Sequence, residues 1–203
     1  MPRAKRQTST VRSLNKPRRV VSCYTYTLYE ILATWNPFFE RLLMTWRQPA
    51  ISQEVAALHP TAGEKILHLG CGSLPTASLL IAQAAPVHVV GIDNNKMAVR
   101  LAQGFIKRKK LAESITIQYG DGGYFPIGDF DAIFIAINVW PLDRVLRHLA
   151  TTMKPSARIL CRSSHDDAES ILKADEFTSV FTINSILKHP NTESVLLSRR
   201  KDV

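Results

Sequence analysis

The chain has 203 residues, of which 45% are hydrophobic, and a formal net charge of +9 at pH 7. This length suits one well-buried domain with a short extension, and no apolar run approaches the roughly 20 residues that a membrane-spanning helix needs. Three scattered cysteines, Cys23, Cys71 and Cys161, fit neither a disulfide framework nor a zinc site. We therefore expect a soluble, cytoplasmic protein that requires no metal.

The positive charge is concentrated at the N-terminus. Residues 1–22 contain only basic charges, +7 in all, so the remaining residues carry a net charge of +2. We expect residues 1–22 to form a basic, flexible tail. Such a tail is either a solubilising segment or one that binds nucleic acid or another anionic surface through phosphate contacts.

Residues 23–60 have the apolar spacing of helices and are expected to form a helical cap. Asn36-Pro37 predicts the start of one helix and Gln48-Pro49 the start of the next. The large apolar residues of the first of these are expected to form its buried face: Phe38, Phe39, Leu42, Leu43 and Trp46. An aromatic stripe at helical spacing more often reflects core packing, and four side chains near the start of the cap are the candidates for a different role: Tyr24, Tyr26, Tyr29 and Glu30.

A glycine loop follows the first predicted strand. Residues 66–69 form a short apolar run, Gly70-Cys71-Gly72-Ser73-Leu74-Pro75 follows, and residues 76–85 have a helical pattern. This order of strand, glycine turn and helix is typical of a nucleotide-type cofactor site, although a purely structural turn is the alternative. Pro75 occupies the place of the third glycine of the dinucleotide motif, which disfavours NAD and FAD because a diphosphate needs close helix packing there.

The second predicted strand, residues 87–92, ends in Asp93 about 20 residues after the glycines, where a ribose-binding carboxylate is expected. Asn94 and Asn95 then cap a helix. The basic run 107–110 closes that helix and is explained by a solvated helix end, with a phosphate-binding patch as the alternative.

The third predicted strand, residues 114–119, runs into Gly120-Asp121-Gly122-Gly123, and a central strand spans residues 132–137. Ligands of open parallel sheets bind at the carboxyl ends of the strands, so Ala136 and Asn138 are expected at the site. Tyr124 and Phe125 are candidates to pack against an adenine ring.

The C-terminal part is predicted to contain a helix over residues 142–153, a strand over 157–161, a short helix over 169–174 and two antiparallel strands over 177–187 and 194–199. His165, beside Asp166 and Asp167, is a candidate general base or metal ligand. The same residues also fit the cap of a helix.

The ordered motifs resemble those of class I S-adenosylmethionine-dependent methyltransferases over about residues 66–203. The loop Gly-Cys-Gly-Ser-Leu-Pro-Thr-Ala-Ser is further similar to that of nicotianamine synthases, as is Phe130-Asp131-Ala132-Ile133-Phe134-Ile135-Ala136. The resemblance implies a three-layer, Rossmann-like α/β domain over residues 61–203, with a mostly parallel seven-stranded sheet. It also implies that the loop holds the methionine part of the cofactor, Asp93 the ribose and Asp121 the adenine amino group.

The cofactor-binding candidates come from the loop and the following strand ends: Gly70, Cys71, Gly72, Ser73, Asp93, Asn94, Asp121, Gly122, Ala136 and Asn138. The catalytic candidates are Tyr29, Glu30 and His165.

Three functions follow from these motifs. The first is methyl transfer to a small molecule, and the second is transfer of the aminobutanoyl arm of S-adenosylmethionine to an amine, as nicotianamine synthases do. The third is a non-catalytic cofactor-binding module that uses its basic tail on nucleic acid or on a partner. The absence of an Asn-Pro-Pro-Tyr motif disfavours methylation of DNA bases and glutamine amides.

Overall fold

The structure is a computed structural model that describes residues 36–137, 139–164, 167–190 and 192–200. Its strands form a single seven-stranded sheet in the order β3-β2-β1-β4-β5-β7-β6. The strands are β1 Lys65–Leu69, β2 His88–Asp93, β3 Ile115–Tyr119, β4 Ala132–Ile135, β5 Arg158–Ser164, β6 Phe181–His189 and β7 Thr192–Arg199. The helices are α2 Pro37–Leu58, α3 Thr76–Ala84, α4 Lys96–Arg108, α5 Leu142–Thr152, α6 Asp167–Leu172 and α7 Asp175–Thr178.

The first five strands are parallel, and β7 pairs antiparallel with both β5 and β6. Near-continuous apolar runs such as Ala132–Ile135 suit this arrangement, because parallel strands are covered by helices on both faces. The predicted mostly parallel, seven-stranded sheet is confirmed.

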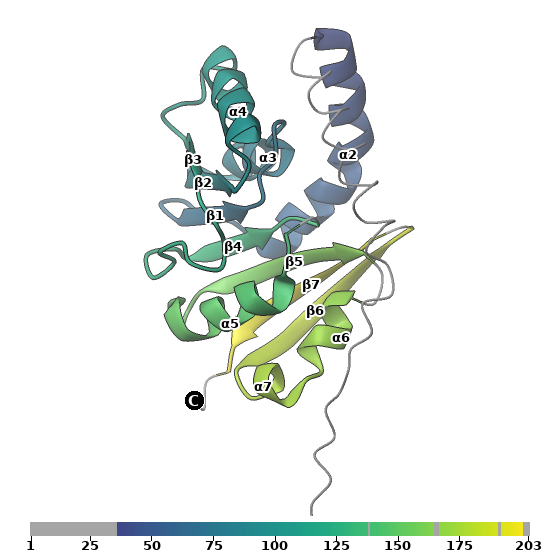
Figure 1. The fold of residues 1–203 in the computed structure, drawn as a ribbon. Coiled ribbons are helices and arrows are strands. Elements are labelled where there is room, and N and C mark those ends of the chain that lie inside the picture. Colours follow the sequence, from purple (N-terminus) through teal and green to yellow (C-terminus); the bar gives the residue numbers. More distant parts are fainter. Residues whose placement is uncertain (1–35, 138, 165–166, 191, 201–203) are drawn as a thin grey trace, which may run out of the picture.

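Helices cover both faces of the sheet, with α2, α3 and α4 on one side and α5, α6 and α7 on the other (Figure 1). The alternation of side chains along each strand divides the core accordingly. On β1, Leu67 and Leu69 pack in the cluster that contains α5, whereas Ile66 packs with α2, α3 and α4. The three layers bring the carboxyl ends of β1 to β5 to one edge of the sheet.

The cap differs from the sequence prediction in two respects. In the described part of the cap, residues 37–58 form one helix, α2, with Pro49 inside it rather than at the start of a new helix. Its buried residues all lie after Pro49, whereas Phe38 is 70% and Trp46 64% exposed, so the predicted buried face is wrong. The physical reason is that the fully buried contacts of α2 come from its C-terminal part, whereas of the earlier apolar residues only Leu43 and Met44 pack against the core, each partly buried. A helical apolar pattern does not say which partner it meets.

Smaller corrections concern element ends. Phe177, predicted to begin a strand, is buried in the short helix α7, and β6 begins at Phe181. On α4, Met97 is exposed, because the buried stripe of this helix passes through Ala98 and Ala102.

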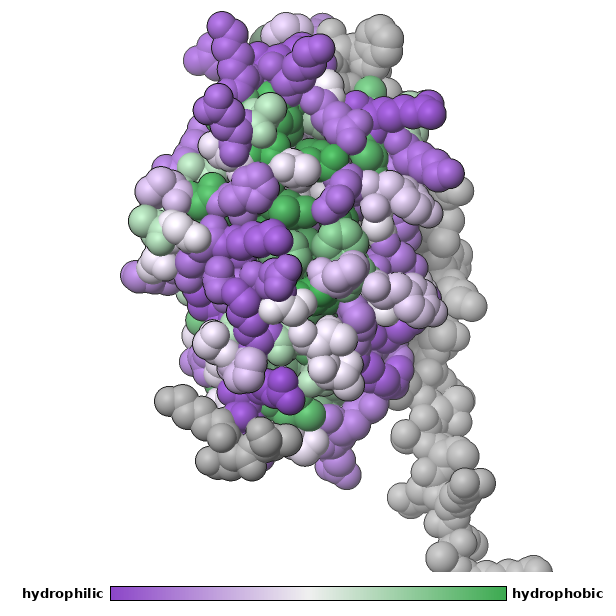
Figure 2. All heavy atoms as spheres, turned by 90° about the vertical axis from the view of Figure 1, so that its left-hand side faces the viewer, coloured by the Kyte–Doolittle hydropathy of each residue, from purple (hydrophilic) through white to green (hydrophobic). Residues whose placement is uncertain are grey.

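The side of the molecule on the left of Figure 1, where α4 and β3 lie, is turned to the viewer in Figure 2. Hydrophilic side chains cover most of this face and hydrophobic groups show between them. Among the residues that the structure describes, no helix is long and apolar enough to cross a membrane.

Candidate functional site

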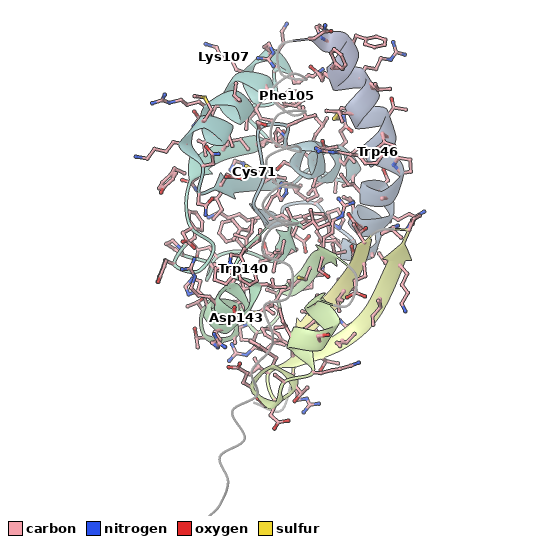
Figure 3. The ribbon with its side chains drawn as sticks, turned by 45° about the vertical axis from the view of Figure 1, so that its right-hand side comes forward. Trp46, Cys71, Phe105, Lys107, Trp140 and Asp143 are labelled. Atoms are coloured by element: carbon pink, nitrogen blue, oxygen red, sulfur yellow. The ribbon has the colours of Figure 1, made fainter. Side chains whose placement is uncertain are left out.

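A cavity of about 670 Å³ opens at the carboxyl ends of the parallel strands. This volume lies within the usual range for small-molecule sites. Trp46 from α2, Cys71 from the loop after β1 and Trp140 from the segment after β4 all line it (Figure 3). The topological switch point lies here, between β1 and β4, because the sheet runs from β1 to β2 on one side and from β1 to β4 on the other.

The glycine loop bends sharply at the floor of the cavity. Gly70 and Gly72 have φ angles of +73° and +67°, a left-handed conformation that favours glycine. A Cβ atom on Gly70 would lie 2.6 Å from Cγ2 of Val139, so the loop also requires the absence of a side chain there. The amides of Gly70 and Cys71 both donate to the carbonyl of Ile92, which ties the loop to the end of β2.

The carboxylate of Asp93 is fixed between this loop and the next helix. Its Oδ2 accepts a hydrogen bond from the Gly72 amide at 3.0 Å, and its Oδ1 accepts one from the Asn95 amide at 2.9 Å. The side chain of Asn95 in turn caps α4 through the amides of Met97 and Ala98. A carboxylate oxygen accepts more than one hydrogen bond, so Asp93 keeps acceptor capacity for hydroxyl groups in the cavity.

The carboxylate of Asp121 is paired with an arginine that the sequence analysis missed. Nη2 of Arg144, from α5, lies 2.9 Å and 2.8 Å from the two carboxylate oxygens. The Gly123 amide donates to Oδ1 at 2.8 Å, and the Arg144 guanidinium lies 5.1 Å from the ring centroid of Tyr124. These contacts orient the loop after β3 at the cavity wall.

Two further polar groups at or near the site are chemically silent at neutral pH. His68 lines the cavity, and its Nδ1 lies 2.7 Å from the hydroxyl of Ser78. Burial lowers the pKa of His68 to about 3, so its ring stays neutral. Burial raises the pKa of the Cys161 thiol to about 12, which excludes it as a thiolate nucleophile.

The structure brings the predicted cofactor residues together. The described members of that set all line the one cavity: Gly70, Cys71, Gly72, Ser73, Asp93, Asn94, Asp121, Gly122 and Ala136. Asn138 and the catalytic candidates Tyr29, Glu30 and His165 lie outside the described residues, as do Tyr24 and Tyr26.

The expected stacking pair at the adenine position is not at the cavity. The ring of Phe125 packs toward Phe130, with ring centroids 6.4 Å apart, and beside Gly120. Tyr124 is exposed and lies against Arg144. Neither ring is among the described residues that line the cavity, because the turn after Gly123 carries both away from it.

Several lining residues had no motif to identify them. They come from segments far apart in the sequence: Trp46, Arg47, Arg162, His189 and Thr192. The one available indication was the Trp46 pattern, which we interpreted as core packing. Within the described ranges, no group of three or more His, Cys, Asp or Glu side chains is placed to hold a metal ion.

Comparison with known proteins gives a family match over the central part of the chain. Residues 66–156 match the family described as methyltransferase domain. A demethylmenaquinone methyltransferase from Lactiplantibacillus plantarum is 25% identical over 134 residues, which cover 63% of this chain and 55% of that protein. O-methyltransferase cnsE from Penicillium expansum is 32% identical over 116 residues, covering 54% and 42%. The chain thus spans about half the length of these curated relatives.

The solved structures that resemble the chain include a mutant of MtNAS, a nicotianamine synthase, in complex with S-adenosylmethionine. Its TM-score is 0.72 at 18% identity, and the alignment covers 90% of this chain and 75% of that one. At this identity the likeness establishes the fold. The ordered glycine loop, the acids at or just after the ends of β2 and β3 and the seven-stranded sheet agree with the match of residues 66–156 to the methyltransferase domain family.

Proposed function

We propose that this protein transfers the methyl group of S-adenosylmethionine to a small molecule. The observation that carries the proposal is the single cavity in which the glycine loop, Asp93 and Asp121 meet and which continues beyond them to Arg162 and His189. One part of the cavity therefore suits a cofactor, and the remainder has room for an acceptor.

The residues at the cofactor part fit this group. Asp93, held by the Gly72 and Asn95 amides, offers acceptor oxygens for two ribose hydroxyls. Asp121 offers an acceptor for the adenine amino group, and residues 70–73 give the methionine part a close approach to the backbone. Pro75, which stands in place of the third glycine of the dinucleotide motif, argues against NAD, because a diphosphate needs close helix packing there.

S-adenosylmethionine supplies an activated methyl group when bound, so the chain itself has to bind, orient and exclude water. The glycine loop and Asp93 would fix the position of the donor. The indole rings of Trp46 and Trp140, which both line the cavity, would cover an acceptor. His68 is neutral and hydrogen-bonded to Ser78, so it supports the loop rather than exchanging protons.

Calorimetry with S-adenosylhomocysteine tests the cofactor site. We expect Asp93→Ala to weaken binding at least tenfold, because a hydrogen bond to a charged group contributes about 1.5–3 kcal/mol. Asp129→Ala, which removes an exposed carboxylate elsewhere on the surface, is the matched control and should change nothing. Binding of NAD in preference to S-adenosylhomocysteine, or unchanged binding by Asp93→Ala, would contradict the proposal.

A second candidate function is transfer of the aminobutanoyl arm to an amine. The likeness to MtNAS over 90% of the chain favours it, together with Leu74, Pro75 and Ser78 in the loop. The by-products separate the two reactions, because methyl transfer leaves S-adenosylhomocysteine and aminobutanoyl transfer leaves methylthioadenosine. Chromatography of a turnover mixture with S-adenosylmethionine and candidate acceptors therefore decides between them.

The comparisons give no support to a nucleic-acid substrate, and we propose a small-molecule acceptor. The basic residues 1–22 lie outside the described residues, so the hypothesis that this tail binds nucleic acid stays a prediction. Loss of turnover on deletion of residues 1–22 would favour it, and unchanged turnover would favour a solubilising role.

A further inference from the structure

The part of the cavity that lies away from the cofactor residues is cationic. Asp93 ends β2, whereas Arg162 lies on β5, and β1 and β4 run between them. Neighbouring strands are about 4.8 Å apart, so the two residues are separated by roughly 14 Å across the sheet. His189, at the end of β6, lines the cavity together with Arg162, and Arg47 from α2 adds a second permanent cation to the lining.

Arg162 is held in place by a carboxylate that does not itself line the cavity. Its Nε lies 3.2 Å from Oε1 of Glu54, whose side chain is 0% exposed. The hydroxyl of Ser194 donates to the same oxygen at 2.6 Å, and Nε2 of His189 lies 3.6 Å from it. Burial raises the pKa of Glu54, while Arg162 opposes this shift by favouring the charged form.

The geometry leaves the outer edge of the guanidinium available to a ligand. The carboxylate of Glu54 lies on the Nε side of the guanidinium, 3.2 Å from Nε, and Nε itself has no hydrogen-bond partner among the described residues. The Arg162 side chain is 18% exposed and faces the cavity. A guanidinium fixed in this way binds a carboxylate with two parallel hydrogen bonds, at a lower entropic cost than a mobile arginine.

A purely structural role for the Glu54–Arg162 pair does not explain why Arg162 lines the cavity. The Glu54–Arg162 pair does join α2 to β5, and Ser194 adds β7 to the contact. Ion pairs that serve only this purpose need not line a cavity, and an apolar contact would join the elements as well. Here Arg162 and Arg47 place positive charge in the lining, while the acidic lining residues Asp93 and Asp121 lie at or just after the ends of β2 and β3.

We propose that the acceptor carries a carboxylate group, which Arg162 binds at this end of the cavity, with Glu54 as the positioning residue for Arg162. This inference rests on the proposed function, since it assigns the cofactor to the Asp93 end. His189, which lines the same end of the cavity, lies near this position. The acceptor class is therefore a small organic acid.

The test uses the full chain saturated with S-adenosylhomocysteine and a panel of aliphatic and aromatic carboxylic acids, each paired with its primary amide. We expect acids to bind in preference to their amides. Arg162→Gln should weaken the acids at least tenfold and leave the amides unchanged, because only the acids lose a charge-assisted contact. Arg162→Lys should retain part of the affinity for the acids, since lysine keeps the positive charge but cannot make the two parallel hydrogen bonds of a guanidinium.

Two further variants separate the loss of this contact from a general loss of charge and from a folding defect. Arg100→Gln removes an exposed arginine on α4 and should leave acid binding intact. If Arg162→Gln fails to fold because Glu54 is left without its partner, the double variant Glu54→Gln, Arg162→Gln removes both charges and should show the same loss of acid binding. Equal binding of acids and amides, no binding of any acid, or unchanged binding by the variants would overturn the proposal.

A carboxylate also belongs to the methionine part of the cofactor, so the source has to be separated. S-adenosylhomocysteine contains that carboxylate and methylthioadenosine does not. If Arg162→Gln weakens the first and spares the second, Arg162 binds the cofactor and the assignment to the acceptor is overturned. If neither ligand binds the unmodified protein, the proposed function fails instead. If only this inference fails, the unmodified protein still binds S-adenosylhomocysteine.

Discussion

His68 makes the stability of the domain sensitive to mild acid, and the size of the effect follows from its burial. The ring is enclosed between β1 and α3, with its Nδ1 at 2.7 Å from the Ser78 hydroxyl and its edge toward Phe134 at a centroid distance of 5.2 Å. Burial lowers its pKa from 6.5 to about 3. In the range between these values the unfolded chain binds a proton at this position and the folded chain does not.

The difference between these two pKa values sets how much the free energy of unfolding falls on acidification. The stability contributed by a neutral His68 is fully present above pH 6.5 and is lost as the pH falls toward 3. Each pH unit below 6.5 costs 1.36 kcal/mol, so acidification to about pH 5 lowers the free energy of unfolding by about 2 kcal/mol. Glu64 and Asp131, whose pKa values are lowered by Arg158 and Lys154 respectively, lose their contributions only at lower pH.

Urea unfolding of the unmodified protein and of His68→Gln at neutral pH and at about pH 5 measures the effect. Glutamine keeps a hydrogen-bonding group for Ser78 but cannot titrate, so the difference between the two proteins isolates His68. We expect the unmodified protein to lose about 2 kcal/mol more than the variant on acidification. An equal loss in both proteins, or a His68 resonance that titrates near 6.5 in the folded state, would refute the argument.

Three further predictions concern the ends of the sheet and the loop. Arg158→Met should lower the free energy of unfolding by about 2 kcal/mol in urea titrations, because Arg158 donates to both carboxylate oxygens of Glu64, at 2.8 and 2.7 Å, and to carbonyls at the end of α2. Burial raises the pKa of Glu54 above 4.5, so its stabilising contribution is present below that pH and is lost as the pH rises. Glu54→Gln should therefore remove this part of the pH dependence of the free energy of unfolding. An unchanged pH dependence in the variant would contradict the prediction. Gly70→Ala should cost more than Gly63→Ala in thermal unfolding and abolish S-adenosylhomocysteine binding, because both glycines have positive φ but only Gly70 lacks space for a Cβ atom.

The sheet and the cofactor part of the site were predictable because their determinants are local in sequence. The apolar run before Gly70 and the acid after the second strand lie within about 30 residues of each other, and each has one physical explanation. Asp93 is held by the amides of Gly72 and Asn95, its near neighbours in the chain or the adjacent strand end. The same locality explains why Asp121 was placed at the cavity wall.

The cap could not be predicted because its partners are distant. Trp46 has the spacing of a buried residue, and it is exposed because the first half of α2 extends beyond the part of the sheet that its second half covers. Pro49 removes one backbone hydrogen bond, yet α2 continues through it, since the packing of Ile51 and Val55 after it stabilises the helix. The pairing of Arg144 with Asp121 joins α5 to the loop after β3 and leaves no periodic pattern in either segment.

The order of the strands also explains why the two parts of the cavity are built from different segments of the sequence. The cofactor part is built from β1, β2 and β3, which lie within residues 65–119 and inside the region that matches the methyltransferase domain family. Arg162 and His189 lie beyond residue 156, where that match ends, and they meet only because β5 and β6 both pair with β7. Under the function proposed above, separate segments hold the cofactor and the acceptor, so substitutions at Arg162 should change which acceptor binds while leaving the affinity for S-adenosylhomocysteine as it is.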